Sequence, residues 1–296
     1  MYVATFLCAP SERVLTVANV LPYHKELNGG EFRWLQEGAA CEFPIPERPE
    51  MEARIWKQLQ ERGVDLVIQR AEGRRKKMLL ADMDSTMIQQ ECIDELADEA
   101  GVGEKVAGIT ARAMNGELDF EEALRERVGL LEGLSEEVID HVLETRITPM
   151  PGGRELVATM KEKGAFCALV SGGFTDFTEG VAHAFGFDEN RANRLEIVDG
   201  KLTGRVIPPI LGREAKVAAL QEITAARGLA VEDVIAVGDG ANDLGMLDLA
   251  GSGVALHAKP SVAAACDIRI NFGDLTALLF VQGYARDEIV IPSVLI

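Results

Sequence analysis

Two aspartates, Asp82 and Asp84, stand directly after a short apolar run in the segment Asp-Met-Asp-Ser-Thr. Side chains two residues apart on extended backbone point the same way, so both carboxylates can face one site where a strand ends. One carboxylate can attack phosphorus and form an acyl phosphate, while the other donates a proton to the leaving alcohol and later takes one from water. A lone Asp-x-Asp also ends ordinary strands, so this chemistry requires companion residues.

A second acidic turn, Gly238-Asp239-Gly240-Ala241-Asn242-Asp243, also follows an apolar run. A carboxylate and a phosphate repel each other, so an aspartate nucleophile needs a cation between them. Oxygen ligands from Asp82, Asp84 and Asp239 suit Mg²⁺. The two acidic turns together predict a magnesium site.

Two further groups have the chemistry to hold a phosphate. Ser171-Gly172-Gly173 offers a hydroxyl and glycines that let backbone N–H groups approach a phosphate oxygen close to a helix N-terminus. Lys216, near the start of a predicted helix, can offset the phosphoryl charge in the transition state. Either signal alone is weak, because Ser-Gly-Gly is commonly a plain turn and a single helical lysine is commonly a solvated surface residue.

Short apolar runs alternate with helical patterns from Met78 onward, which is typical of a parallel sheet covered by helices. Ligands of such a sheet bind outside the carboxyl ends of its strands, so we expect Asp82, Ser171 and Asp239 to meet at one crevice. The predicted fold class is α/β, with a Rossmann-like parallel sheet at its core. The predicted strands are Met78–Ala81, Ala165–Val170, Val234–Val237, Val254–Leu256 and Ile268–Ile270.

The segment between the first two predicted strands, about 80 residues, is far longer than a crossover needs, and its pattern is helical. Asp119 is expected to cap one helix and Ser135 to begin another. We interpret roughly residues 89–150 as a small helical cap over the crevice. Further along, Asp199-Gly200 between two β-prone runs predicts a hairpin, and residues 212–227 predict a helix.

The first part of the chain has a different character, with both tryptophans, a middle broken by prolines and no cluster of catalytic residue types. We predict a separate small α+β domain over residues 1–72. A catalytic domain over residues 73–296 then carries the helical insertion. The basic stretch Arg74–Lys77 between the two is interpreted as a solvated linker.

The ordered combination of these motifs is more specific than any one of them. The chain resembles the haloacid dehalogenase-type phosphatases in the order of its motifs, which are Asp-x-Asp-Ser-Thr, Ser-Gly-Gly, a lysine and Gly-Asp-Gly-x-Asn-Asp. The exact residues of the first and last motifs resemble those of the members that hydrolyse phosphoserine. The resemblance covers Met78 to about Gly283. It implies a haloacid dehalogenase-like core with a helical cap and Mg²⁺ as cofactor. The preceding residues resemble, in size and α+β character, the ACT-like extensions of some bacterial members.

The resemblance also implies a role for each motif residue around the phosphoryl group. By this resemblance, Asp82 is the nucleophile and Asp84 the general acid and base. The phosphate contacts are Ser171, Gly172 and Lys216, and the metal ligands are Asp82, Asp84 and Asp239. Asn242 contacts phosphate or substrate, and Asp243 supports the metal and Lys216.

Substrate choice is expected in the cap, because a closing cap excludes water and presents new groups. By the same resemblance, Glu91 takes the ammonium of the substrate and Arg127 its carboxylate, for which a guanidinium fork is well suited. Judged from spacing alone, both are ordinary charges on a helix surface. The amino-acid specificity therefore rests on the resemblance.

The expected function is Mg²⁺-dependent hydrolysis of O-phosphoserine through an aspartyl-phosphate, the last step of serine biosynthesis. One alternative keeps the covalent intermediate but passes the phosphoryl group to an acceptor alcohol such as homoserine. Another is a regulatory amino-acid-binding protein with an inactive phosphatase fold, which the intact set of candidate catalytic residues disfavours. Formation of a homodimer through the N-terminal unit is a further hypothesis.

The composition narrows the range of partners. A formal net charge of −18 disfavours nucleic acid, because phosphate-backbone binding draws on clustered lysine and arginine. The five cysteines lack any Cys-x-x-Cys pair, so neither a disulfide framework nor a zinc site is expected. No stretch has the character of a signal sequence or a membrane span. We therefore expect a cytoplasmic enzyme that acts on a small phosphorylated amino acid, with no nucleic-acid or membrane partner.

Overall fold

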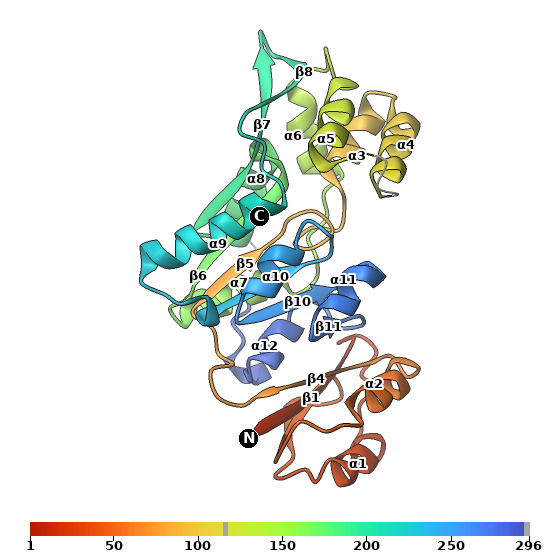
Figure 1. Cartoon of the computed structure of the whole chain (residues 1–296), viewed down its shortest axis with the longest axis vertical. Helices are drawn as coiled ribbons and strands as arrows, with labels where there is room; N and C mark the ends of the chain where they lie inside the picture. The colour runs from red at the N-terminus through yellow and green to blue at the C-terminus, as the bar shows by residue number, and fades with distance from the viewer. Residues whose placement is uncertain (115–117, 293–296) are drawn as a thin grey trace.

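The computed structural model describes residues 1–114 and 118–292, and it contains two β-sheets (Figure 1). The larger sheet has seven strands and the smaller one four. In spatial order the larger sheet consists of β11 (Ile268–Ile270), β10 (Ser252–Leu256), β9 (Val234–Gly238), β5 (Met78–Ala81), β6 (Phe166–Phe174), β7 (Glu189–Val198) and β8 (Lys201–Ile207).

The centre of the larger sheet is parallel, as predicted, because β5 pairs in parallel with both β6 and β9. All five predicted strands are present, and the α/β fold class is confirmed. Every residue of β5 is buried, with alternate side chains on opposite faces: Leu79 and Ala81 join one hydrophobic cluster, and Met78 and Leu80 join another.

Helices cover both faces of this sheet. One face packs against α7 (Gly153–Glu162), α8 (Thr175–Phe185) and α12 (Ala277–Val281), and the other against α9 (Arg213–Arg227), α10 (Leu244–Leu249) and α11 (Pro260–Ala265). Two apolar cores therefore hold the strands rigid, and the polar strand ends project from a fixed frame.

The insertion between β5 and β6 is helical, with α3 (Cys92–Glu99), α4 (Gly103–Met114), α5 (Phe120–Gly129) and α6 (Glu137–Thr145). Asp119 caps α5 by accepting a hydrogen bond from the Glu122 N–H at 2.8 Å. The helix expected after Ser135 is present as α6, but it begins at Glu137 with Glu136 at its N-cap, and Ser135 itself forms a β-bridge with Lys201. The insertion lies at the end of the molecule opposite the N-terminus (Figure 1).

The predicted hairpin is formed by β7 and β8, which pair antiparallel from Val198 and Lys201. Asp199 and Gly200 between them have φ values of 51° and 73°, the left-handed conformation that a two-residue turn of this kind requires. The hairpin contacts the insertion, since the Gly133 N–H donates to the Leu202 carbonyl at 2.8 Å. The sheet and the insertion are therefore tied together at this edge.

The smaller sheet lies in the N-terminal part of the chain and has the order β2-β3-β1-β4. Helices α1 and α2 pack on one of its faces and share a separate hydrophobic cluster with it. Leu7 and Val67 of the opposite face belong instead to the main apolar core, so this sheet packs directly on the rest of the protein. Its elements are β1 (Tyr2–Cys8), α1 (Val17–Glu26), β2 (Arg33–Gln36), β3 (Ala40–Ile45), α2 (Glu52–Gln60) and β4 (Val64–Arg70).

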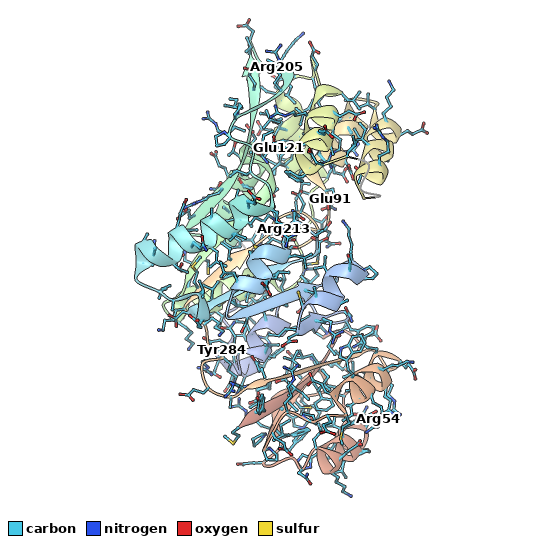
Figure 2. All side chains as sticks on the ribbon, in the orientation of Figure 1. Arg54, Glu91, Glu121, Arg205, Arg213 and Tyr284 are labelled. Atoms are coloured by element: carbon cyan, nitrogen blue, oxygen red, sulfur yellow. The ribbon has the colours of Figure 1, made fainter. Side chains whose placement is uncertain are left out.

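The basic stretch Arg74–Lys77 is only partly the solvated linker that its composition suggested, because Arg75 and Lys77 are exposed whereas Arg74 is largely buried. Arg74 donates two hydrogen bonds to Glu42, at 2.6 and 3.0 Å, and both side chains are largely buried. Arg75 lies over the ring of Tyr284, 4.1 Å from its centroid, where the two parts of the protein meet (Figure 2). The stretch therefore holds the N-terminal sheet against the rest of the protein.

Among the described residues, no helix combines the length and the hydrophobicity that crossing a lipid bilayer requires.

Candidate active site

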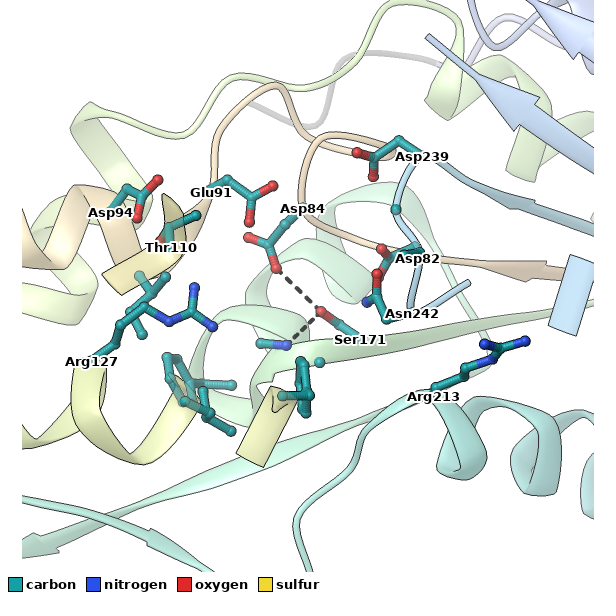
Figure 3. A pocket seen from close by; sticks show the side chains of 18 of the residues that line it. Asp82, Asp84, Glu91, Asp94, Thr110, Arg127, Ser171, Arg213, Asp239 and Asn242 are labelled. Carbon is teal, nitrogen blue, oxygen red and sulfur yellow. Dashed lines mark hydrogen bonds between the residues drawn. The ribbon is translucent and has the colours of Figure 1, made fainter. Parts of the chain in front are cut away.

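A cavity of about 630 Å³ opens where the strand ends of the larger sheet face the helical insertion (Figure 3). The ends of β5, β6 and β9 supply one side of it, and α3 to α5 supply the other. Its lining includes Asp82, Asp84, Glu91, Asp94, Thr110, Phe120, Arg127, Ser171, Gly172, Arg213, Asp239, Asn242 and Lys259. Residues from separate motifs are thus brought into one space.

Three carboxylates gather at the floor of this region: Asp82, Asp239 and Asp243 are all buried, and one oxygen of each lies within 4.8 Å of the others. Burial raises the pKa of Asp82 and of Asp239, and the nearby charge of Asp243 raises both further. Such crowded buried carboxylates need a cation, and an all-oxygen donor set fits a hard divalent metal. Asp243, expected to support the metal and Lys216, lies beside Asp82 and Asp239 and pairs with Lys216.

Lys216 is buried between two of these carboxylates rather than solvated. Its Nζ lies 2.6 Å from Oδ1 of Asp82 and 2.6 Å from Oδ1 of Asp243. Burial alone would lower the pKa of Lys216, but Asp243 and Asp82 raise it above its ordinary value, so the ammonium stays charged. A fixed positive charge therefore lies against the candidate nucleophile.

The position of Asp243 depends on a glycine at position 238. The second oxygen of Asp243 accepts hydrogen bonds from the N–H groups of Asp239 at 3.2 Å and Gly240 at 3.0 Å. A Cβ at Gly238 would lie 2.4 Å from the carboxyl carbon of Asp243, so only glycine permits this approach. The glycine-rich turn is thus built around the aspartate that it carries.

Asp84 points to the insertion side of the cavity. One of its oxygens accepts from the Cys92 N–H at 2.8 Å and the other from the Ser171 hydroxyl at 3.2 Å (Figure 3). Its carboxylate is therefore not part of the three-carboxylate group, and its assignment as a metal ligand stays a prediction. Burial raises the pKa of Asp84, which favours a carboxyl group that can carry a proton.

Ser171 and Gly172 lie within β6, which continues to Phe174, and not in a turn after the strand. The pairing of β6 with β7 shifts register between Val170 and Phe174, so the segment forms an irregularity at the strand end. The Ser171 hydroxyl accepts the Gly173 N–H at 2.9 Å, and α8 begins at Thr175. The expected proximity to a helix N-terminus is therefore present.

Glu91 and Arg127 face the cavity from the insertion, and in Figure 3 the Arg127 guanidinium points toward Glu91 and Asp84. The Ser85 hydroxyl donates to Glu91 at 2.8 Å, and Arg127 Nε donates to the Ala123 carbonyl at 3.2 Å. Glu91 is reached by solvent through the cavity but has protein on most sides. This partial desolvation, with a smaller contribution from Asp84, raises its pKa to about 7.

Several residues that line the cavity were not among the site residues assigned from the sequence. Asp94 follows Glu91 by three residues, a helical spacing that could have revealed it, and it is the acidic residue that most opposes the lowering of the Arg127 pKa by burial. Phe120 packs against the main apolar core and also lines the cavity, and Thr110, Arg213 and Lys259 line it too. The buried Oγ1 of Thr110 has no hydrogen-bond partner among the described residues, and no local pattern indicated either Thr110 or Lys259.

Comparison with known proteins places these features in a family context. Residues 79–248 match the family described as haloacid dehalogenase-like hydrolase. The chain is 45% identical over 230 residues to a phosphoserine phosphatase of Streptomyces coelicolor, which covers 77% of this chain and 56% of that protein. It is 46% identical over 200 residues to a phosphoserine phosphatase of Streptococcus thermophilus, covering 68% and 93% of the two chains.

The N-terminal part is also included in a structural match. A crystal structure of a haloacid dehalogenase family hydrolase from Salmonella enterica serovar Typhi superposes with a TM-score of 0.86 at 30% identity, covering 95% of this chain and 99% of the other. The chain spans little more than half the length of the first curated relatives it matches, 56% and 53%.

Proposed function

Because this chain belongs to the haloacid dehalogenase-like hydrolases, we propose that it hydrolyses O-phosphoserine to serine and phosphate, the last step of serine biosynthesis. One observation carries the proposal: a single cavity is lined by Asp82, which pairs with the buried Lys216, and by the Glu91 and Arg127 side chains. Asp82 and Lys216 suit phosphoryl transfer, and Glu91 and Arg127 have charges opposite to the ammonium and the carboxylate of an amino acid. The relatives named as phosphoserine phosphatases support the same substrate.

Asp82 is the proposed nucleophile. Its Oδ1 is occupied by the Met83 N–H at 2.8 Å and by Lys216 at 2.6 Å, which leaves Oδ2 to attack phosphorus. The Asp82–phosphorus bond forms as the bond from phosphorus to the serine oxygen breaks, and Asp84 gives its proton to that oxygen. Water then attacks phosphorus, Asp84 takes a proton from it, and phosphate leaves with Asp82 regenerated.

Mg²⁺ is the proposed cofactor, with Asp82, Asp84 and Asp239 as its proposed ligands, because carboxylate oxygens suit this ion. Asp243 is proposed to support the site from behind, since its oxygens already accept hydrogen bonds from Lys216 and from the Asp239 and Gly240 N–H groups. When bound, the ion offsets the repulsion between the carboxylate and the phosphoryl group. Lys216 adds a buried positive charge beside Asp82. The Ser171 hydroxyl and the Gly172 backbone orient the phosphoryl oxygens, and Asn242 lies within reach of phosphate or substrate.

The proposed amino-acid contacts are Glu91 to the ammonium and Arg127 to the carboxylate. Asp94 and Glu91 both lie on the Arg127 side of the cavity, so a zwitterionic ligand finds both signs of charge there. A phosphomonoester without these charges would lose both contacts. The specificity therefore belongs to the insertion and the phosphoryl chemistry to the sheet.

The deciding experiment is a phosphate-release panel of phosphoserine, phosphothreonine, phosphoethanolamine and a sugar phosphate, with and without Mg²⁺. We expect phosphoserine to be preferred and EDTA to stop the reaction, because the buried carboxylates then repel the phosphate. Mg²⁺ should restore activity, and Ca²⁺ should restore little of it, since Ca²⁺ prefers more ligands and looser geometry. Preference for the sugar phosphate would contradict the proposal.

The same panel separates hydrolysis from transfer. A phosphotransferase would release little free phosphate when an acceptor alcohol such as homoserine is abundant, and the phosphorylated acceptor would accumulate. A regulatory binding protein would bind phosphoserine without releasing phosphate at all.

Glu91 gives the proposed reaction a predictable pH dependence. Its pKa is raised to about 7, so the carboxylate needed for the ammonium is progressively lost as the pH falls through that value. We expect KM for phosphoserine to rise below about pH 7 more steeply than KM for an aryl phosphate, which has no ammonium. Glu91→Gln should remove this difference; an unchanged difference in that variant would exclude Glu91 as the ammonium contact.

The division into residues 1–72 and 73–296, the cap over residues 89–150 and dimerisation through the N-terminal unit stay proposals. Light scattering of the full chain and of a variant with a charge added on the outer strand β2 would test the dimer.

A further inference from the structure

A buried aspartate of the N-terminal sheet, Asp65, has no part in the proposed reaction. It lies on β4, is fully buried, and accepts hydrogen bonds from three successive N–H groups, those of Asn271 at 3.0 Å, Phe272 at 2.9 Å and Gly273 at 3.1 Å. Successive N–H groups on one carboxylate form an anion-binding nest. No cation pairs with Asp65 among the described residues, so this nest compensates for its burial.

A second side chain, from the end of helix α2 in the N-terminal part, reinforces the contact. Gln60 donates to Asp65 at 3.4 Å and to the Val64 carbonyl at 3.0 Å, and it accepts the Asn271 side-chain amide at 2.6 Å. We call residues 271–276, which follow β11, the junction loop. Its first residue is therefore held through both main chain and side chain by the N-terminal part of the protein.

The other side of the junction loop touches the segment that enters the active-site cavity. His257 Nε2 lies 2.8 Å from the Gly273 carbonyl, and because a carbonyl only accepts, that nitrogen carries the proton. Two residues further on, the Lys259 N–H donates to the Asp239 carbonyl at 3.2 Å. Lys259 lines the cavity, and its charge opposes the rise that burial causes in the pKa of Asp239.

The junction loop also contacts the base of the helical insertion. The Leu275 N–H donates to the Pro151 carbonyl at 3.0 Å, just after Pro149 forms a bridge with Ile88 where the insertion begins and ends. A Cβ at Gly152 would lie 2.6 Å from the Thr276 nitrogen, so the two backbones approach as closely as glycine allows. One loop thus touches the N-terminal sheet, the His257–Lys259 segment and the stem of the insertion.

We propose that Asp65 is a positioning residue of the active site, acting through the junction loop on the His257–Lys259 segment and on the insertion stem. The N-terminal sheet is then a structural part of the catalytic site, because the Asp65 carboxylate fixes the position of the junction loop. That loop in turn contacts the His257–Lys259 segment and the stem of the insertion. The inference rests on the proposed phosphatase function. Small displacements of groups around a reacting centre cost rate even when they originate far from it.

The test compares Asp65→Asn with Glu42→Gln in the full-length protein. Asparagine keeps the shape of Asp65 but replaces one acceptor oxygen with an NH₂ group, which cannot accept an N–H bond. Glu42→Gln weakens the Arg74 contact between the same two parts of the protein without touching the junction loop. We expect kcat to fall between about 10- and 100-fold in Asp65→Asn, for phosphoserine and for an aryl phosphate alike, and to change little in Glu42→Gln.

Amide hydrogen exchange supplies a readout that does not depend on substrate identity. In Asp65→Asn, protection should fall at Asn271–Gly273 and also at Lys259, whose N–H is bonded to Asp239; in Glu42→Gln it should fall at neither. Equal kcat losses in the two variants, or unchanged Lys259 protection in Asp65→Asn, would overturn the inference. If Asp65→Asn does not fold, Gln60→Ala carries the same test through Asn271. A wild type inactive on phosphoserine but active on the aryl phosphate would defeat only the proposed substrate.

Discussion

Replacing Asp82 with asparagine is expected to reduce turnover by on the order of 10⁴-fold or more, because the amide cannot attack phosphorus and the covalent intermediate cannot form. The shape of the side chain is kept, and the Met83 N–H at 2.8 Å still finds an oxygen acceptor. Lys216 loses one of its two carboxylate partners but keeps Asp243 at 2.6 Å. The protein should therefore stay folded while losing activity.

Steady-state phosphate release, with melting temperature as a check on folding, measures this effect. Acid quenching with labelled phosphoserine should leave hydroxylamine-sensitive label on the wild type and none on Asp82→Asn. Asp233→Asn is the matched control, because Asp233 lies at the opposite end of β9 and pairs with Lys77 outside the cavity. Activity near the wild-type level in Asp82→Asn would exclude Asp82 as the nucleophile.

Truncation of Arg127 to alanine is expected to lower kcat/KM for phosphoserine by about 100-fold or more. The reason is that the substrate carboxylate would be buried without its guanidinium partner, which costs several kcal/mol of binding free energy. Among residues 1–114 and 118–292, the one hydrogen bond that Arg127 donates is to the Ala123 carbonyl, and burial lowers its pKa. It is thus held inside the cavity at a desolvation cost that an anionic ligand would offset. An aryl phosphate should lose no more than a few-fold.

Arg125→Ala provides the control for this measurement. Arg125 lies on the same helix two residues away, but its side chain is exposed and pairs with Glu121 on the surface at 3.3 Å. Its removal should change neither substrate by more than about twofold, since exposed pairs of this type contribute little. Equal losses for phosphoserine and the aryl phosphate in Arg127→Ala would show that the insertion does not select the amino acid.

The central strands of the catalytic core could be predicted from the sequence because they are short apolar runs that are buried on both faces, and only the edge strand Ile268–Ile270 carries a polar residue among the five predicted. Met78–Ala81 and Ile268–Ile270 have the predicted bounds. The Asp199-Gly200 turn was equally local, since the left-handed conformation restricts which residues can occupy it. The helix after Ser135 was predicted, but Ser135 does not cap it, because it forms a long-range bridge to Lys201.

Side-chain environment could not be obtained in the same way. Lys216 had the sequence context of a solvated helical lysine, yet it is buried between Asp82 and Asp243 because α9 packs that face on the sheet. Arg74 appeared to belong to an exposed basic linker, yet it pairs with Glu42. In each case the partner is remote in sequence, and only folding brings the two together.

The sequence by itself determined the order of the strands along the chain, the polar residues at their ends and the residue types available for phosphoryl chemistry, because apolar periodicity and turn geometry are properties of neighbouring residues. Only the tertiary structure decided that Asp243 joins Asp82 and Asp239, and that Asp65 holds the loop beside Lys259. Those relations depend on burial and on the packing of elements far apart in the chain. No local pattern encodes them.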